Sequence, residues 1–319
     1  MTAGSVDQYG KTRGRRRPSP KEAPVGDPAS RLVDSARPSE SMLRLVIRRF
    51  RRHRLAIVSL YLLLAIAIIS FGVPLVVSED AANRLVLAEK SQPPTVQHPF
   101  GTDEVGRDIF LRSIFGGRIS LRIGFIAALI SVGIGMAIGA VAGYNRGWID
   151  SVLMRFTDAL LSIPSLFILI VITQIIGKSI SIITIVIGAL SWMTVSRIVR
   201  ANVLSIREQD FVLAARGIGA QPLALLGRHI MPNTLAPVIV AATLGVGQAI
   251  IMEASLSFLG LGVQQPTATW GNMLFRAQSY LVTAPWIAFF PGFLILITVL
   301  CVNFIGDGLR DALDPHTRR

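Results

Sequence analysis

Six long apolar runs are the feature of this sequence that most limits what it can fold into. The runs cover residues 55–77, 123–144, 156–176, 180–195, 234–252 and 286–304. Most come close to the roughly 20 residues that a helix needs to cross a bilayer. Hydrophobic residues make up 51% of the chain and charged residues only 16%, whereas soluble domains carry about 25% charged residues. The sequence therefore predicts an all-α membrane protein with six transmembrane helices.

The charges between the runs predict how the chain lies in the membrane. Lys and Arg number 24 in one alternating set of segments and 7 in the other. The first set comprises residues 1–54, 145–155, 196–233 and 305–319. Because positively charged loops stay on the cytoplasmic side, both termini are predicted to be cytoplasmic. Most of the net charge of +13 lies before the first run, without a folded basic domain or interleaved aromatic residues. We therefore expect no nucleic-acid partner.

Four parts follow one another along the chain. Residues 1–41 are rich in Pro, Ser, Gly and Arg and predict a disordered basic cytoplasmic tail. Residues 42–54 place apolar side chains at helical spacing among arginines, which predicts an amphipathic juxtamembrane helix on the lipid surface. Residues 55–306 form the six-span domain, and residues 307–319 are predicted to be a cytoplasmic C-terminal tail.

Sequence motifs of catalysis are missing. Gly177-Lys178-Ser179 comes nearest to a phosphate-binding loop, but Ile172 occupies the position where that loop needs glycine. The single cysteine, Cys301, and four dispersed histidines exclude a disulfide framework and predict no metal cluster. We expect a chain that is not an enzyme and holds no cofactor or metal of its own.

Glycines and two acidic residues in the runs suggest specific roles. Gly135, Gly139 and Gly143 are four residues apart and predict a helix face that packs closely on another helix. Asp158 lies near the inner end of the third run, so we expect it to be interfacial or paired. Glu253, at the outer end of the fifth run, either contacts a solute or partner or is an interfacial acid satisfied within the chain.

The outer segment before the second run concentrates charged residues. Asp103, Glu104, Arg107 and Asp108 follow Thr102 within a few residues. Thr102 is a suitable N-cap, and acidic side chains in a first turn complement the helix dipole. The pattern predicts a short amphipathic outer helix that runs to about Phe115 and ends at Gly116-Gly117.

The cytoplasmic segment between the fourth and fifth runs predicts two short helices. Phe211, Ala214, Ala215 and Ile218 form one narrow apolar stripe. Glycines 217 and 219 then break the helix, and a second helix begins near Pro222 and is predicted to end at Pro232. A shallow stripe of small residues is suited to docking into a groove on another protein. The alternative is an elbow that packs on its own chain.

Several motifs, in order along residues 42–315, carry a resemblance to a known family. Residues 212–219 and 228–233 (VLAARGIG and RHIMPN) resemble the EAA loop of ABC importer permeases, although Leu213 replaces its glutamate. The segments 50–56, 100–108, 253–262, 269–273 and 303–311 resemble the C-type permease subunit of dipeptide, oligopeptide and nickel importers. The chain is thus similar to the permease subunit of an ATP-driven peptide importer in the cell membrane.

The resemblance implies partners and site residues. The partners are a homologous second permease, two P-loop ATPases that hold ATP and Mg²⁺, an extracytoplasmic peptide-binding protein and membrane lipid. The residues implied in ATPase coupling are Phe211, Ala214, Ala215, Arg216, Gly217, Gly219, Arg228 and Pro232. The residues implied in contact with the binding protein are Asp103, Glu104, Arg107, Asp108 and Glu253.

Two alternatives remain open at the level of sequence. The same kind of permease can serve nickel complexes or glutathione, because the family's subgroups share these motifs. A channel or secondary carrier that works without ATP is the alternative from another class. Such carriers usually place ionisable groups near the midplane, and apart from Cys301 the first, second, fourth and sixth runs have none at depth.

Overall fold

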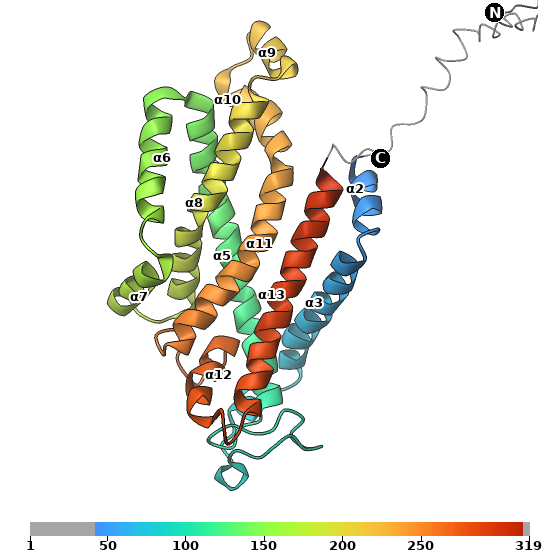
Figure 1. Ribbon diagram of the computed structural model, residues 1–319, viewed down its shortest axis with the longest axis vertical. Helices are drawn as coiled ribbons and strands as arrows, with labels where there is room; N and C mark the ends of the chain where they lie inside the picture. The colour runs from blue at the N-terminus through green and yellow to red at the C-terminus, as the bar shows by residue number, and fades with distance from the viewer. Residues whose placement is uncertain (1–41, 315–319) are drawn as a thin grey trace, which may run out of the picture. The chain divides into compact units, whose positions relative to one another are not determined.

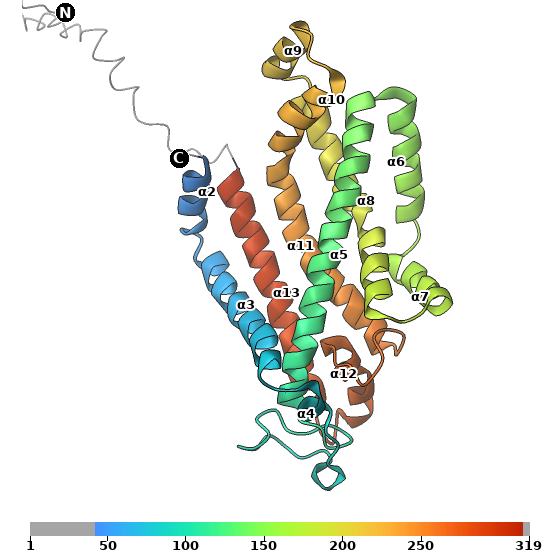
Figure 2. The same cartoon turned by 180° about the vertical axis from the view of Figure 1, so that it is seen from behind.

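The computed structural model describes residues 42–314, and every regular element in that range is a helix. Figures 1 and 2 show the long helices lying side by side. The predicted tail 1–41 and the last five residues of the predicted C-terminal tail lie outside the described residues. The all-α expectation is confirmed for the part of the chain that the structure describes.

Five helices are long and apolar enough to cross a membrane. They are α3 (Arg54–Gly72), α5 (Ile109–Asn145), α8 (Ile180–Ile206), α11 (Met231–Phe258) and α13 (Trp286–Leu313). The shorter helices are α2 (Met42–Phe50), α4 (Glu79–Asn83), α6 (Gly147–Leu161), α7 (Ser165–Ile176), α9 (Asp210–Gly217), α10 (Pro222–Ala224) and α12 (Trp270–Ala277). Single turns complete the set: η1 (Val73–Leu75), η2 (Leu87–Glu89), η3 (Leu225–Ile230) and η4 (Gln278–Tyr280).

The third predicted span is broken. Instead of one helix over 156–176, the structure has α6 and α7, which meet at an angle of 83°. Pro164 lies at the break and starts α7 with φ −59° and ψ 121°. Proline has no N–H to donate and drives the residue before it away from helical geometry. The apolar pattern concealed this interruption, and α6 also begins nine residues earlier than expected, at Gly147.

The glycine face of α5 packs against α8, as the spacing predicts. A Cβ atom on Gly135 would lie 2.6 Å from Val195, and one on Gly139 would lie 2.4 Å from the Ser196 carbonyl oxygen. Gly143 meets Arg200 and Val203 in the same way. The contacted residue on α8 always lies about sixty positions after the glycine on α5, so the contacts advance in the same direction along both helices. Helices α5 and α8 therefore run parallel. The α6–α7 pair therefore returns the chain from the end of α5 to the start of α8 (Figure 2).

The expected short outer helix is wrong. Residues 101–108 form a loop, α5 begins at Ile109 with Asp108 as its N-cap, and the helix continues to Asn145. It does not stop at the two glycines, because they serve close packing there. A Cβ on Gly117 would come within 2.4 Å of the Ser70 hydroxyl and 2.8 Å of the Trp270 ring.

Pro232 does not end a helix either. One continuous helix runs from Pro222 to Phe258 through α10, η3 and α11. The π-helix η3 ends at Ile230, two residues before Pro232. In a regular α-helix the proline ring would clash with the carbonyl of Arg228, and the wider π turn accommodates it.

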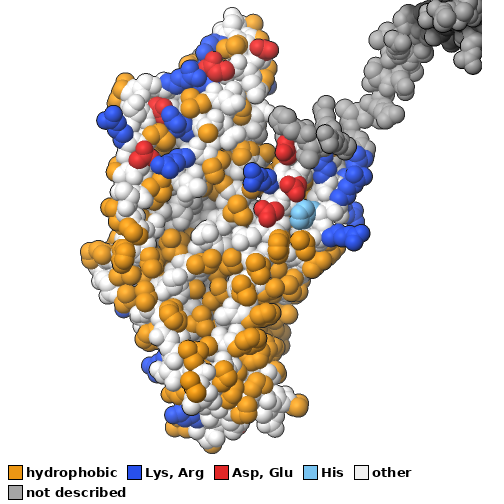
Figure 3. All heavy atoms as spheres, viewed as in Figure 1, with side chains coloured by type: hydrophobic (Ala, Val, Ile, Leu, Met, Phe, Trp, Pro, Cys, Tyr) orange, Lys and Arg blue, Asp and Glu red, His pale blue; other side chains and the backbone are white. Residues whose placement is uncertain are grey.

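The two described ends of the chain lie together. Helix α2 is the predicted amphipathic helix, although it ends at Phe50 and α3 starts at Arg54. Gly308 of α13 lets the Phe50 ring and Ala56 approach closely, and Arg49 Nη1 donates to the Asp314 carbonyl over 2.9 Å. In Figure 3 charged side chains gather around the end that carries α2 and α9, and hydrophobic side chains cover most of the remaining face.

Candidate functional site

An elbow formed by α9 and α10 projects beyond the long helices (Figure 1). Helix α9 ends at Gly217, and Gly219 takes φ +87°, a conformation that glycine adopts without steric cost. Gln221 is extended, and Pro222 then starts α10 as a first-turn proline. The predicted break after Gly217 is confirmed, whereas the helix that begins at Pro222 is not short, because it continues to Phe258.

The elbow is seated on the protein by two side chains of α9. Val212 and Ala215 are buried, and they share one apolar cluster with Val203 and Ile206 of α8 and Leu225 of η3. Ala215 therefore faces inward and does not belong to an outward stripe. The inward face of α9 fixes the elbow to the end of α8.

The opposite face of the elbow is apolar and exposed. Ile218 is 88% exposed and Leu223 is 82% exposed, and Phe211 and Ala214 are exposed beside them. Arg216 and Arg228 are exposed as well, and neither forms an ion pair with another residue of 42–314. Apolar surface flanked by unpaired cations is typical of a surface that binds another protein.

A polar cluster supports the base of the elbow. Arg207, which follows α8, donates to the carbonyl oxygen of Tyr144 at the end of α5, and its guanidinium lies 5.8 Å from the Tyr144 ring. Glu208 bridges Arg146 and Arg207 at 2.8 and 3.5 Å. Burial, and then the neighbouring charge of Arg146, lower the pKa of the Arg207 guanidinium. The cluster ties the ends of α5 and α8 together where the chain turns into α9.

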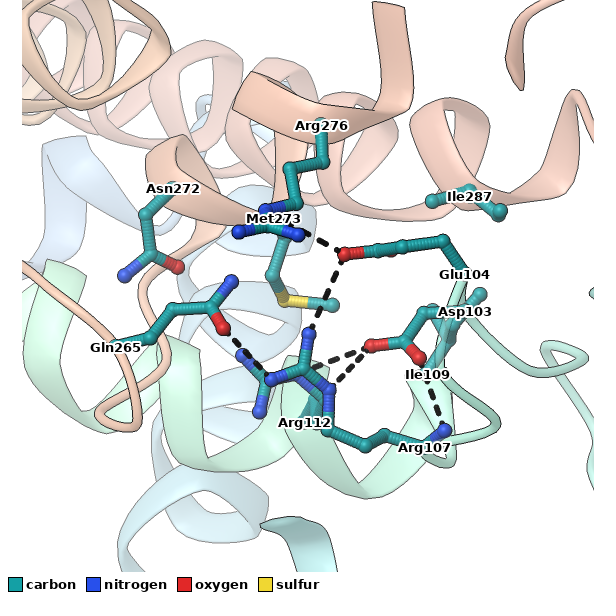
Figure 4. Close-up of a pocket in the computed structure, with 10 residues that line it drawn as sticks. All are labelled: Asp103, Glu104, Arg107, Ile109, Arg112, Gln265, Asn272, Met273, Arg276 and Ile287. Atoms are coloured by element: carbon teal, nitrogen blue, oxygen red, sulfur yellow. Dashed lines mark hydrogen bonds and ion pairs between the residues drawn. The ribbon is translucent and has the colours of Figure 1, made fainter. Parts of the chain in front are cut away.

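At the other end of the molecule lies the segment 90–108 between η2 and α5, which we call the outer loop after its predicted side of the membrane. Its residues Asp103, Glu104 and Arg107 are buried in one ionic cluster (Figure 4). Arg107 Nε donates to Asp103 Oδ2 over 2.6 Å, and its Nη1 donates to Gln265 Oε1 over 2.9 Å. Glu104 lies 3.6 Å from Arg107 and 3.8 Å from Arg276 of α12. Asp103, Glu104 and Arg107 are exposed by only 5 to 8%. The cluster thus joins the outer loop to α12.

Asp108 and Thr102 anchor the same loop. Asp108 Oδ1 accepts the backbone N–H of Leu111 over 2.8 Å and so caps α5, and its Oδ2 lies 2.7 Å from His98 Nδ1. His98 Nε2 lies 3.3 Å from Glu89. Thr102 is fully buried and contacts the carbonyl of Glu89 and the N–H of Gln92 instead of capping a helix.

Glu253 is fully buried near the C-terminal end of α11. Ser257 donates to its Oε1 over 2.7 Å, and Ser120 of α5 donates to its Oε2 over 3.3 Å. The Ser120 oxygen also accepts the backbone N–H of Trp270 at the start of α12. Glu253 therefore joins three helices and is satisfied inside the chain.

Two family models match this sequence. Residues 135–319 match the binding-protein-dependent transport system inner membrane component family. The chain belongs to that family. Residues 41–94 match the N-terminal TM domain of oligopeptide transport permease C. The protein is thus a membrane-embedded permease of the ABC transporter class.

Several relatives align with this permease over most of their lengths. The dipeptide transport system permease protein DppC of Alkalihalophilus pseudofirmus is 41% identical over 275 residues, covering 86% of this chain and 90% of the relative. DppC of Bacillus subtilis is 40% identical and covers 91% of both chains. The oligopeptide transport system permease protein OppC of Haemophilus influenzae is 39% identical and covers 91% of this chain and 94% of the relative.

A solved structure supports the fold of the permease. The inward-facing methionine ABC transporter MetNI contains a chain that superposes with a TM-score of 0.54 at 19% identity. The superposition covers 65% of this permease and 98% of the matched chain. The helix arrangement is therefore that of an ABC transporter permease.

The expected site residues fall into three groups in the permease. Phe211, Ala214, Arg216, Gly217, Gly219 and Arg228 are exposed on or beside the elbow, with Pro232 exposed at the start of α11. Ala215 is buried beneath the elbow. Asp103, Glu104 and Arg107 are buried, Asp108 is half-buried and Glu253 is fully buried, so these side chains bind one another and their own chain in this conformation.

Other residues at the two ends escaped the sequence analysis. The Arg207–Glu208–Arg146 cluster draws on residues some sixty positions apart, and no short motif signals it. The capping box of α12, in which Thr269 and Asn272 exchange hydrogen bonds, could have been found from its Thr-x-x-Asn spacing.

Asp158, by contrast, is paired with Arg197 of α8, as expected of a charge in that run.

Proposed function

We propose that this permease is the transmembrane subunit of an ATP-driven importer of dipeptides or oligopeptides. Relatives named as dipeptide and oligopeptide permeases, aligned over about nine-tenths of the chain, support this substrate class. The permease forms part of the pathway for the solute, and ATP hydrolysis takes place on separate subunits.

The chain crosses the membrane six times, with both termini in the cytoplasm. The parallel packing of α5 and α8 supports this topology, because the broken pair α6–α7 must return the chain between them. The excess of Lys and Arg at the end that carries α2 and the elbow supports the orientation.

The exposed elbow carries the proposal. Its inward face is held by Val212 and Ala215, which leaves Phe211, Ile218 and Leu223 available to a partner. A short helix with an apolar outer face fits a groove on an ATPase. Arg216 and Arg228 are placed to meet acidic side chains at the rim of that groove. Movement of the ATPases thereby reaches the end of α8.

The complete importer contains a second homologous permease, two P-loop ATPases that bind ATP and Mg²⁺, and an extracytoplasmic peptide-binding protein. The buried cluster of Asp103, Glu104 and Arg107 shapes the outer loop that meets the binding protein. Exposed residues held by that loop, such as Leu87 and Val96, provide the contact surface.

Purification of the chain from membranes in mild detergent tests the proposal. We expect two P-loop ATPases, a second permease and a peptide-binding protein to co-purify. A double variant, Ile218→Asp with Leu223→Asp, should lose the ATPases and keep the second permease. The matched control is Val76→Asp, which changes a valine that is 90% exposed just after η1. A chain that purifies alone and transports solute without ATP would contradict the proposal.

A further inference from the structure

A cavity of about 410 Å³ lies among α5, α7, α8 and α11, halfway along the long helices. Ala127 and Met193 are the central residues of α5 and α8, Gly245 lies at the centre of α11, and all three line the cavity. Its volume is within the roughly 300–1,000 Å³ of small-molecule sites. The cavity is therefore large enough to hold a solute in the middle of the membrane-spanning part.

The break in the third span opens onto this cavity. Leu161 and Ser165, on the two sides of the break, both line it, and the residues between them are exposed. Irregular backbone inside a membrane persists only where it is covered by protein or faces water. Because this chain does not cover residues 162–164, they face either water or a partner subunit.

None of the residues that line the cavity is ionisable. Its polar side chains are hydroxyl and amide groups, and they belong to Ser131, Ser165, Ser191, Thr194 and Gln248. Ser191 Oγ donates to the Ile187 carbonyl over 2.7 Å, which leaves its oxygen able to accept a further hydrogen bond. Gln248 and Thr194 are exposed, and neither side chain has a hydrogen-bond partner among residues 42–314.

Such groups are not suited to hydrocarbon. An amide that faces lipid without a partner is costly, because nothing there replaces its hydrogen bonds to water. A lining that offers donors and acceptors without charge matches the N–H and C=O groups of a peptide backbone.

We infer that this cavity is a solute-binding site in which Gln248, Thr194 and Ser191 hold a peptide by hydrogen bonds to its backbone. The inference rests on the proposed function and adds to it a position along the pathway. Gln248 belongs to α11 and Thr194 to α8, so the two side chains bind the peptide from different sides of the cavity.

Uptake of radiolabelled trialanine by the complete importer in liposomes tests this site. The double variant Gln248→Leu with Thr194→Val removes two sets of hydrogen bonds and should lower the uptake rate about tenfold. The matched control is Thr243→Val, whose hydroxyl bonds to the Ile239 carbonyl over 2.9 Å outside the cavity lining. The control should transport at the wild-type rate, and the double variant should still be recovered in assembled complexes.

Thiol labelling provides a second, direct measurement. In a Cys301→Ser background, Gln248→Cys should react with a charged methanethiosulfonate reagent, and trialanine under turnover should slow that reaction. The same reagent should react slowly with Ile68→Cys on α3, with or without peptide. Wild-type uptake by the double variant, or labelling of position 248 that ignores trialanine during uptake, would overturn the site. A wild-type importer that takes up no peptide at all would instead remove the proposed function, and the site with it.

Discussion

Two buried acidic residues, Asp103 and Glu253, have different roles in this chain. Asp103 lies among cations, with Arg107 at 2.6 Å and Arg112 at 3.9 Å. Glu253 has only hydroxyl donors, Ser257 and Ser120, at its carboxyl group. The first acid compensates buried positive charge, and the second completes a hydrogen-bonded junction. Their substitutions should therefore differ in consequence.

Removing the Asp103 carboxylate should destabilise the outer end of the permease. In Asp103→Ala, Arg107 loses its closest ion pair while it stays buried, and breaking a buried pair in this way costs about 3–5 kcal/mol. Thermal unfolding of the purified protein in detergent measures the loss. Asp80→Ala, which removes an exposed acid of α4, is the control and should unfold like the wild type. Equal unfolding temperatures for the two variants would show that the cluster contributes no stability.

Glu253 should tolerate its neutral isostere. Glu253→Gln keeps groups that can hydrogen-bond to Ser120 and Ser257, so we expect stability close to the wild type. Glu253→Leu removes the acceptor to which both buried hydroxyl groups donate and should cost about 1–3 kcal/mol. The same unfolding measurement separates the two variants. A large loss in Glu253→Gln would mean that the negative charge itself is required.

At the scale of elements, the contact between α5 and α8 organises the bundle. Three glycines on α5 face Val195, Val199 and Val203 on α8 along a parallel pair of helices. Close approach of backbones is the usual means by which helices associate in lipid, since burial of apolar surface gives little advantage there. The glycine spacing predicted a packing face, and the structure identifies α8 as its partner.

Filling this face should separate the two helices. Gly139→Leu would place a side chain where even a Cβ meets backbone at 2.4 Å, so we expect a cost of at least about 1–3 kcal/mol from overpacking. Gly133→Leu is the matched control, because nothing lies within 4 Å of a Cβ at that glycine on the same helix. The yield of folded protein in detergent and its unfolding temperature compare the two. Equal behaviour would contradict a tight α5–α8 interface.

Local signals predicted the long helices and the elbow, whereas tertiary packing decided the rest. Apolar runs and the helix-breaking glycines 217 and 219 are properties of short stretches, and they correctly predicted five of the long helices and the end of α9. The stop at Gly116-Gly117 failed because α12 and α3 approach there, which is a contact with residues far along the sequence. The inward orientation of Ala215 likewise depends on the end of α8. Burial of Glu104 and Arg107 could not be predicted from a charged loop, because Glu104 contacts Arg276 of α12 and Arg107 donates to Gln265, both of which lie more than 150 residues along the chain.

At the scale of the whole molecule, charge is distributed between two ends. Charged side chains gather at the end that carries α2 and the elbow (Figure 3), where α2 and the last turn of α13 contribute arginines. The buried ionic cluster of Asp103, Glu104 and Arg107 lies at the other end (Figure 4). Between them the exposed surface is largely apolar. This distribution is what a protein that spans a bilayer requires.

Single cysteines should report the orientation of the permease. In a Cys301→Ser background, Val96→Cys in the outer loop should react with a membrane-impermeant reagent on intact cells. In cells that produce the permease without its ATPases, so that nothing covers the elbow, Ile218→Cys should react only after the membrane is opened. Both side chains are highly exposed, at 101% and 88%, so access depends on the side of the membrane and not on burial. The reverse pattern would place the elbow outside.

The α5–α8 contact also has a mechanical meaning. Two helices locked together over several turns behave as a stiff strut, and α8 alone extends about 40 Å at 1.5 Å per residue. Residues 207–209 connect the C-terminal end of α8 to α9, and Val212 and Ala215 of α9 pack on the same end. We expect a push on α9 to reach the opposite end of α8 as a rigid displacement. On the other side of the cavity, the chain is interrupted between α6 and α7. A rigid pair of helices, α5 and α8, therefore faces a pair that can bend.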